Sequence, residues 1–334
     1  MAWFRSAPGR CLSDFGFRIP FGFLPTVKSY TFIDYATQGY MALVGVVILA
    51  LHGTAVPHWQ WLVGLHAVCM GLVHLLIQIC AARPTNRVLA FLRHFYPILL
   101  YTGFYRETGS LNQMLVTGYL DPVFIRLDQR IFGFQPSLSW METLPYLPLS
   151  EVLYASYFSY YLMIFGVGLA LFLRSREQFF HYVSVVSFVF YVCYLIYIFL
   201  PVMGPRIFFR EITDYRLPAE VQPQVPPTFP EAVRAGPFYQ IMAFIYRTFE
   251  APGAAFPSSH VAVALCTVGF SFLYLRRIRY LHLVVAVLLC LATVYCRYHY
   301  VVDVIAGVVT AAVLVPLGHW LYFRFQRTGD SAKA

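Results

Sequence analysis

The sequence predicts an all-α fold: a polytopic membrane helix bundle with about eight transmembrane helices, and six as the minimum. Two features of its composition predict this fold. Of the 334 residues, 59% are hydrophobic and only 12% are charged, against roughly 25% charged residues in soluble domains. Aromatic residues make up 18% of the chain, which suits apolar helix packing and the lipid headgroup border. We therefore expect one helical bundle rather than separate domains.

Eight stretches approach the roughly 20 apolar residues that a spanning helix requires. They cover residues 33–52, 60–82, 88–105, 151–173, 179–200, 259–275, 280–295 and 300–323. The third stretch is the weakest, because Arg93, His94 and Pro97 interrupt it. We expect this helix to be tilted, broken or partly interfacial.

Two connections are more than simple loops. In the first, apolar residues recur at helical spacing between charges from Leu120 to Gly133, which predicts an amphipathic helix lying along the membrane interface. In the second, five prolines between Arg210 and Gly236 disfavour regular structure. The stretch 239–249 predicts another short surface helix. These segments either form a lid over a site or cap the helix ends.

The net charge of +9 does not indicate nucleic-acid binding, because the basic residues form short clusters beside apolar runs rather than one polar face. Those clusters instead predict how the chain is oriented in the membrane. Placing the N-terminus inside gathers most of the 24 Lys and Arg residues in short loops and tails on one side. The positive-inside rule then places both termini in the cytoplasm and the long connections on the extracytoplasmic face, periplasmic or lumenal.

Ionisable groups gather at the edges of three apolar runs, where they are costly unless they are used. His299 and Asp303 are four residues apart, so they share one face of a helix. A carboxylate on one imidazole nitrogen fixes the tautomer and raises the basicity of the other nitrogen, which suits a histidine nucleophile. The alternative is a histidine and an aspartate that satisfy each other inside a packed bundle.

The sequence Pro257-Ser258-Ser259 before His260 is typical of a helix start. A phosphate at this end would meet backbone N–H groups, serine hydroxyls and His260. A plain helix cap with an interfacial histidine is the alternative.

Arg206 and Arg297 add guanidinium groups, whose forked geometry matches phosphate oxygens, although arginines at a membrane border often extend to lipid headgroups. We expect folding to bring these run edges together, with two imidazoles facing each other across one pocket.

Two motifs carry a family resemblance. Phe256-Pro-Ser-Ser-His260, followed by Arg297-Tyr-His-Tyr-Val-Val-Asp-Val-Ile-Ala-Gly307, resembles the second and third signature motifs of the type 2 phosphatidic acid phosphatase (PAP2) superfamily. Gly204-Pro-Arg206 and the Arg-x-His-Tyr-x-x-Asp pattern resemble its inositolphosphotransferase branch, which includes inositol phosphorylceramide synthase. The motif-bearing resemblance covers residues 151 to about 320.

This resemblance implies a role for each motif residue. His299 would be the nucleophile that forms a phosphohistidine, and Asp303 would orient it. His260 would protonate the leaving oxygen and then activate the acceptor. The phosphoryl oxygens would be held by Ser258, Ser259, Arg206 and Arg297.

The chain departs from the family pattern at three places. The motif PSGH is PSSH here, Ala292 and Thr293 replace the usual Ser-Arg pair, and a Lys-x6-Arg-Pro first motif is missing. Arg297 would substitute for the missing arginine. These departures favour the transferase-like branch over an ordinary phosphatidate phosphatase.

The resemblance therefore implies a lipid phosphatase or phosphotransferase of the outer leaflet that needs no cofactor and no metal. Its partners would be a lipid substrate and the bilayer, and the acceptor would be water or a lipid alcohol such as ceramide. Two other interpretations stay open. The same cluster could bind anionic headgroups in a non-catalytic or transport protein, or two histidines and an aspartate could form a facial metal site.

These expectations divide the chain into five parts. They are a cytoplasmic N-terminal segment (1–30), N-terminal transmembrane helices (31–110), an outer interfacial segment (111–150), a catalytic bundle (151–323) with an outer loop (201–257), and a cytoplasmic tail (324–334).

Overall fold

The computed structural model describes residues 30–53, 56–211, 221, 228–249 and 251–331, and its thirteen elements in these ranges are all α-helices. Five helices are long and apolar enough to cross a membrane. They are α1 (Phe32–Leu51), α2 (Trp59–Ala82), α6 (Leu147–Arg174), α7 (Arg176–Phe199) and α13 (Val301–Ser331). The prediction of an all-α, polytopic membrane protein is confirmed.

Three further helices occupy the remaining predicted stretches. They are α3 (Arg87–Leu111), α11 (Ser259–Tyr274) and α12 (Arg279–Tyr295). Helix α3 runs unbroken through Pro97 for 25 residues. Its charge is accommodated inside the protein, because the Arg93 guanidinium forms an ion pair with the buried carboxylate of Asp34 in α1.

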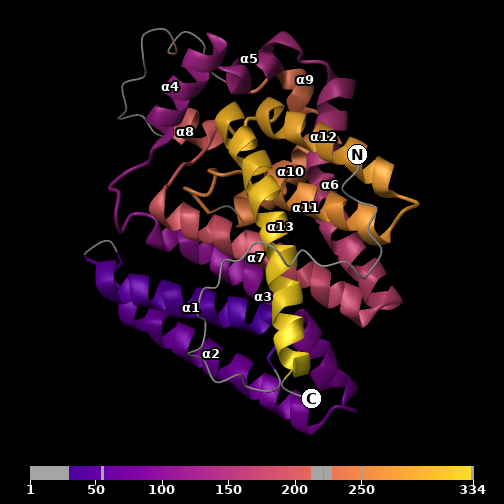
Figure 1. The fold of residues 1–334 in the computed structure, drawn as a ribbon. Helices are drawn as coiled ribbons and strands as arrows, with labels where there is room; N and C mark the ends of the chain where they lie inside the picture. The colour runs from indigo at the N-terminus through magenta and orange to yellow at the C-terminus, as the bar shows by residue number, and fades with distance from the viewer. Residues whose placement is uncertain (1–29, 54–55, 212–220, 222–227, 250, 332–334) are drawn as a thin grey trace, which may run out of the picture.

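Helix α7 lies at the centre of the bundle. It packs against α1, α3, α6, α11 and α13, and most of its side chains are buried. In Figure 1, α1 and α2 lie side by side at the lower edge, while α13, drawn in yellow, crosses the front of the bundle. Helix α7 therefore links the N-terminal helices to the C-terminal ones.

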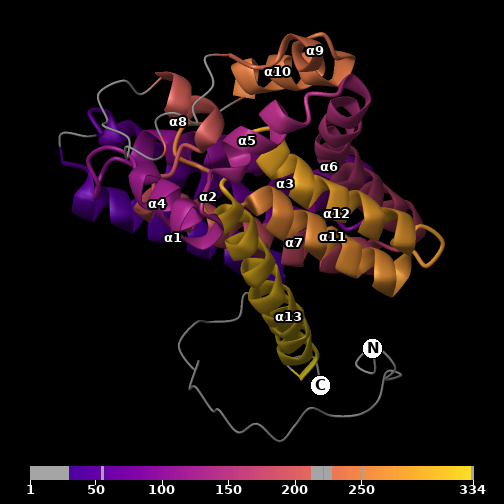
Figure 2. The same cartoon turned by 90° about the horizontal axis from the view of Figure 1, so that it is seen from above.

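Short helices connect the long ones, and most of them lie in the upper part of Figure 1. They are α4 (Asp121–Phe132), α5 (Pro136–Thr143), α8 (Pro205–Glu211), α9 (Glu231–Arg234) and α10 (Pro237–Phe249). Helices α4 and α10 confirm the helices predicted at 120–133 and 239–249. Figure 2 shows α9 and α10 together at one margin of the molecule, and α10 packs on α6. Most of the proline-rich stretch between 210 and 236 lies outside the described residues.

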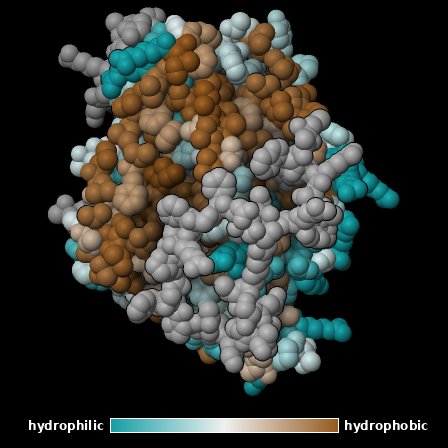
Figure 3. All heavy atoms as spheres, viewed as in Figure 1, coloured by the Kyte–Doolittle hydropathy of each residue, from teal (hydrophilic) through white to brown (hydrophobic). Residues whose placement is uncertain are grey.

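The surface carries many exposed apolar side chains. On α2, for example, Trp61 is 81% exposed and Leu72 is 59% exposed. Figure 3 shows apolar residues, in brown, across much of one face of the molecule. A soluble protein rarely exposes so large a contiguous apolar area, and lipid contact accounts for it.

Candidate active site

Two predicted site histidines line one cavity. His260 lies in the first turn of α11, and His299 lies in the turn between α12 and α13. Their ring centroids are 5.8 Å apart. Both rings border a cavity of about 30 Å³ that Arg206 also lines. The structure therefore brings the two imidazoles and Arg206 to one pocket.

Backbone hydrogen bonds tie together the three loops that carry these side chains. The N–H of Ala255 donates to the carbonyl of Val202 (2.8 Å), that of Arg206 to Arg297 (2.7 Å), and that of Ser258 to Asp303 (3.1 Å). Each bond joins two of the three segments 202–206, 255–260 and 297–303. The relative positions of the histidines and Arg206 are consequently fixed by main-chain contacts.

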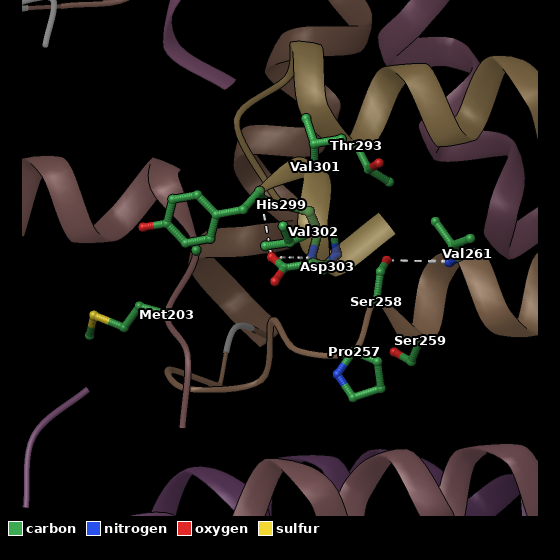
Figure 4. Close-up of polar contacts among 12 residues, drawn as sticks. Met203, Pro257, Ser258, Ser259, Val261, Thr293, His299, Val301, Val302 and Asp303 are labelled. Atoms are coloured by element: carbon green, nitrogen blue, oxygen red, sulfur yellow. Dashed lines mark hydrogen bonds and ion pairs between the residues drawn. The ribbon is translucent and has the colours of Figure 1, made fainter. Parts of the chain in front are cut away.

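Asp303 lies directly behind His299 (Figure 4). One carboxylate oxygen, Oδ2, is 3.5 Å from His299 Nδ1 and accepts a hydrogen bond from the N–H of Tyr300 at 2.9 Å. The other oxygen, Oδ1, is buried and has no hydrogen-bond partner among the described residues. Both side chains are almost completely buried. The carboxylate thus lies on the Nδ1 side of the His299 ring.

Burial keeps His299 uncharged. Desolvation lowers the pKa of its imidazole to about 3, the nearby His260 ring adds to this effect, and a hydrogen bond with the backbone of Ala255 partly offsets it. A neutral imidazole has the lone pair that a nucleophile requires.

His260 is held by aromatic rings. The centroid of Tyr160 is 4.6 Å from that of His260, and the centroid of Tyr157 is 5.0 Å away. Both tyrosines come from α6 and are buried. Aromatic contacts of this kind fix the orientation of the ring.

Arg206 reaches the cavity from the start of α8. The carbon atom at the centre of its guanidinium lies 4.7 Å from the ring centroid of Tyr246 and 5.5 Å from that of Tyr298. Cation–π contacts of this kind hold an arginine in place. Tyr246 belongs to α10, so that surface helix contributes directly to the site.

Gly204 allows the Arg206 loop to approach the His299 turn. Its φ is +87°, and a Cβ at this position would lie 2.5 Å from the carbonyl oxygen of Tyr298. Any other residue would be strained in this conformation and would also push the two loops apart.

The two serines lie at the start of α11 but are not among the residues that line the cavity. The hydroxyl of Ser258 accepts the N–H of Val261 at 3.4 Å, as a helix cap does. The N–H of Ser259 donates to the hydroxyl of Tyr197 at 3.2 Å. Several donors expected for a phosphate are thus used inside the protein. The phosphate-binding role of Ser258 and Ser259 stays a prediction.

Arg297 also lies outside the cavity lining. Its guanidinium forms a 2.5 Å ion pair with Glu142 of α5 and lies over the ring of Phe229. Its backbone φ of +63° falls in the left-handed region, which is costly for a residue with a side chain. The structure does not bring Arg297 to the cavity that the two histidines line. A phosphate-binding role for Arg297 stays a prediction.

Sequence reasoning missed two buried carboxylates of α4. Asp121 and Asp128 are fully buried, and both contact the site loops. Burial raises the pKa of Asp121 to about 6, although several hydrogen-bond donors lower it. The available signal was helical periodicity: positions 121 and 128 share a face with the buried Phe124 and Ile125, so both acids lie on the apolar side of the helix.

Two further findings concern the competing interpretations and the family. Within the described ranges, no three His, Cys, Asp or Glu side chains lie close enough together to hold a metal ion. A family profile described as "PAP2 superfamily" matches residues 123–317, which is more than half of the chain. No curated protein and no solved structure gives a significant match.

Proposed function

The chain belongs to the PAP2 superfamily, and from this premise we propose that it is a membrane-embedded lipid phosphatase or phosphotransferase. One observation carries the proposal. Two imidazoles, one of them backed by a carboxylate, border the same cavity as an arginine. Phosphoryl transfer through a histidine requires a nucleophile, an acid and a cation in this arrangement.

In the first step, Nε2 of His299 attacks the phosphorus of a lipid phosphoester. A P–N bond forms while the bond from phosphorus to the leaving oxygen breaks. His260 gives its proton to that oxygen. Asp303 holds the imidazole of His299 in the tautomer that carries the proton on Nδ1, and it stabilises the cation formed by the attack.

In the second step, neutral His260 takes a proton from the acceptor, whose oxygen attacks the phosphohistidine. The P–N bond breaks and both histidines return to their starting states. With water as acceptor the reaction is hydrolysis, and with a lipid alcohol it is transfer. The family match does not distinguish the branches of the superfamily. Transfer to a lipid alcohol such as ceramide is therefore the more specific alternative that we propose beside hydrolysis.

Arg206 supplies positive charge to the phosphoryl oxygens. Its place in the cavity lining and its fixed guanidinium support this role. We propose that Ser258, Ser259 and Arg297 assist it when substrate is bound. With this charge in place, the proposed mechanism needs no metal.

We propose that the eight long helices cross the bilayer, with both termini in the cytoplasm. The site would then face the extracytoplasmic leaflet, as the distribution of basic residues predicts. The phosphoryl group would enter the cavity that His260, His299 and Arg206 line, and the acyl chains would remain in the lipid beside the bundle.

The decisive experiment incubates the purified protein with a panel of phospholipid and lipid-phosphate donors, with and without alcohol acceptors. Mass spectrometry identifies the products. We expect release or transfer of a phosphate-bearing group, inhibition by vanadate, resistance to chelators, and phosphate trapped on His299. Binding of anionic lipids without turnover would instead support a transport or binding protein, and loss of activity with a chelator would support a metal site.

A further inference from the structure

Helix α4 carries two carboxylates on one buried face. Asp121 and Asp128 are both 0% exposed, whereas Arg126 and Arg130 on the other side of the helix are exposed. Buried carboxylates are expensive unless hydrogen bonds compensate for lost water. The hydrogen bonds of these two acids therefore show what α4 does.

Asp121 binds the loop that leads to Arg206. Its carboxylate accepts hydrogen bonds from the N–H groups of Met203 (2.8 Å) and Gly204 (2.9 Å), and from the hydroxyl of Tyr300 (3.0 Å). The first two donors lie just before Arg206. The third lies between His299 and Asp303, so a single carboxylate contacts both loops.

Asp128 binds the start of α13. Its two oxygens accept the N–H groups of Val301 at 2.9 Å and Val302 at 3.1 Å. These donors belong to the first turn of the helix, whose backbone N–H groups need acceptors. Tyr300, the residue before α13, has no side chain suited to capping. Asp128 supplies that cap from another helix, and its negative charge lies at the positive end of the helix dipole.

We propose that Asp121 and Asp128 are positioning residues for phosphoryl transfer, which hold the Arg206 loop and the His299 turn at a fixed separation. This inference rests on the proposed function. Neither acid lines the cavity, so both act through the loops they bind. Misplacement of reacting groups by about 1 Å can cost on the order of 100-fold in rate, so the loss of either contact has a measurable effect.

The experiment compares the full-length protein with Asp128→Asn and Asp121→Asn in lipid nanodiscs. Arg130→Gln, on the exposed face of the same helix, is the matched control. We expect kcat to fall by about 10- to 100-fold in both Asn variants, with KM within about threefold. Backbone hydrogen exchange should accelerate at 301–302 in Asp128→Asn and at 203–204 in Asp121→Asn.

Unchanged kcat together with faster exchange would overturn the proposal, because the acids would then serve folding alone. Should an Asn variant fail to fold, Tyr300→Phe tests the same contact more gently, since it removes only the hydroxyl that donates to Asp121. We expect about a tenfold loss of kcat from this variant in a folded protein, and wild-type kcat would count against the proposal.

Vanadate binding separates this inference from the proposed function. If the wild-type protein turned over no lipid phosphoester, the proposed function would fail, but vanadate could still be titrated as a phosphate mimic. Weaker vanadate binding by Asp128→Asn than by Arg130→Gln would support the positioning role. Equal affinity in these two variants would overturn it.

Discussion

Two buried ionic clusters among the described residues differ in how completely their carboxylates are bound. In the first, between α1 and α3, both oxygens of Asp34 accept hydrogen bonds, from Thr31, Arg93 and Tyr96. In the second, at the start of α13, Asp303 Oδ1 has no partner among the described residues, and Oδ2 is 3.5 Å from the His299 ring.

In the proposed mechanism, this difference separates a structural cluster from a reactive one. Buried polar groups are normally satisfied, and an exception needs an explanation. The Asp34 carboxylate has used its hydrogen-bonding capacity to join two helices. In the second cluster, Asp303 keeps hydrogen-bonding capacity next to His299, which lines the cavity, and the proposed mechanism uses this carboxylate to stabilise the cation on His299. Both clusters look alike in the sequence, because each places ionisable residues in or beside apolar runs.

Removing the two histidines of the site is the strongest test of the difference between the two clusters. We expect His299→Ala and His260→Ala to abolish turnover while the protein stays folded in the membrane, because one removes the nucleophile and the other the proton donor. Product formation by mass spectrometry and the thermal midpoint measure the two quantities. The control is His282→Ala, which should remain active. It removes an imidazole that is hydrogen-bonded to the hydroxyl of Ser271 in α11. Full activity in either site variant would contradict the mechanism.

Asp303→Asn should lower kcat by several orders of magnitude, because an amide no longer holds the reactive tautomer of His299 or stabilises its cation. Single-turnover trapping of the phosphoenzyme reports this first step. A loss of less than tenfold would show that Asp303 does not orient the nucleophile.

Asp34→Ala should give the opposite signature. Removing one partner of a buried ion pair costs about 3–5 kcal/mol, so the thermal midpoint should fall sharply. Activity per folded molecule should stay near that of the wild type, because α1 and α3 do not carry the histidines. A stable Asp34→Ala protein with reduced kcat would remove the distinction between the two clusters.

The two arginines test how far the reactive cluster extends. Arg206→Gln should weaken vanadate binding by about 10- to 100-fold, as expected for the loss of a hydrogen bond to a charged group. Arg297→Gln should have a smaller effect, because its guanidinium is held by Glu142. The reverse order, measured by the same titration, would return the main phosphate contact to Arg297.

The smallest effect concerns pH. Because burial lowers the pKa of His299 to about 3, its ring should stay neutral in the folded protein from pH 5 to 8. The unfolded chain should protonate it near the ordinary value of about 6.5. The contribution of His299 to the free energy of unfolding therefore rises with pH between the folded pKa of about 3 and the unfolded pKa of about 6.5, and it is complete above the unfolded pKa. The ring ¹⁵N shifts of His299 report its state, and protonation near pH 6.5 in folded protein would contradict the prediction.

Much of the fold could be predicted from hydrophobicity, because each of the eight apolar stretches is a helix in the structure. The third stretch looked weak since the sequence does not show that Arg93 meets Asp34, 59 positions earlier. The proximity of His260 and His299 was expected because both lie at edges of apolar runs that the predicted topology places on one face. The direction of the Arg297 side chain could not be predicted, because it depends on an ion pair with Glu142. Glu142 belongs to α5, a helix that the sequence did not predict.

The contact between Gly204 and the carbonyl of Tyr298 has an evolutionary consequence. Because glycine has no Cβ, the two loops can approach each other at this position. A mutation at this codon therefore cannot be neutral while Arg206 and His299 keep their roles. Homologous chains that retain both functional residues should retain this glycine, and lineages that lose it should have lost the arginine or the histidine as well.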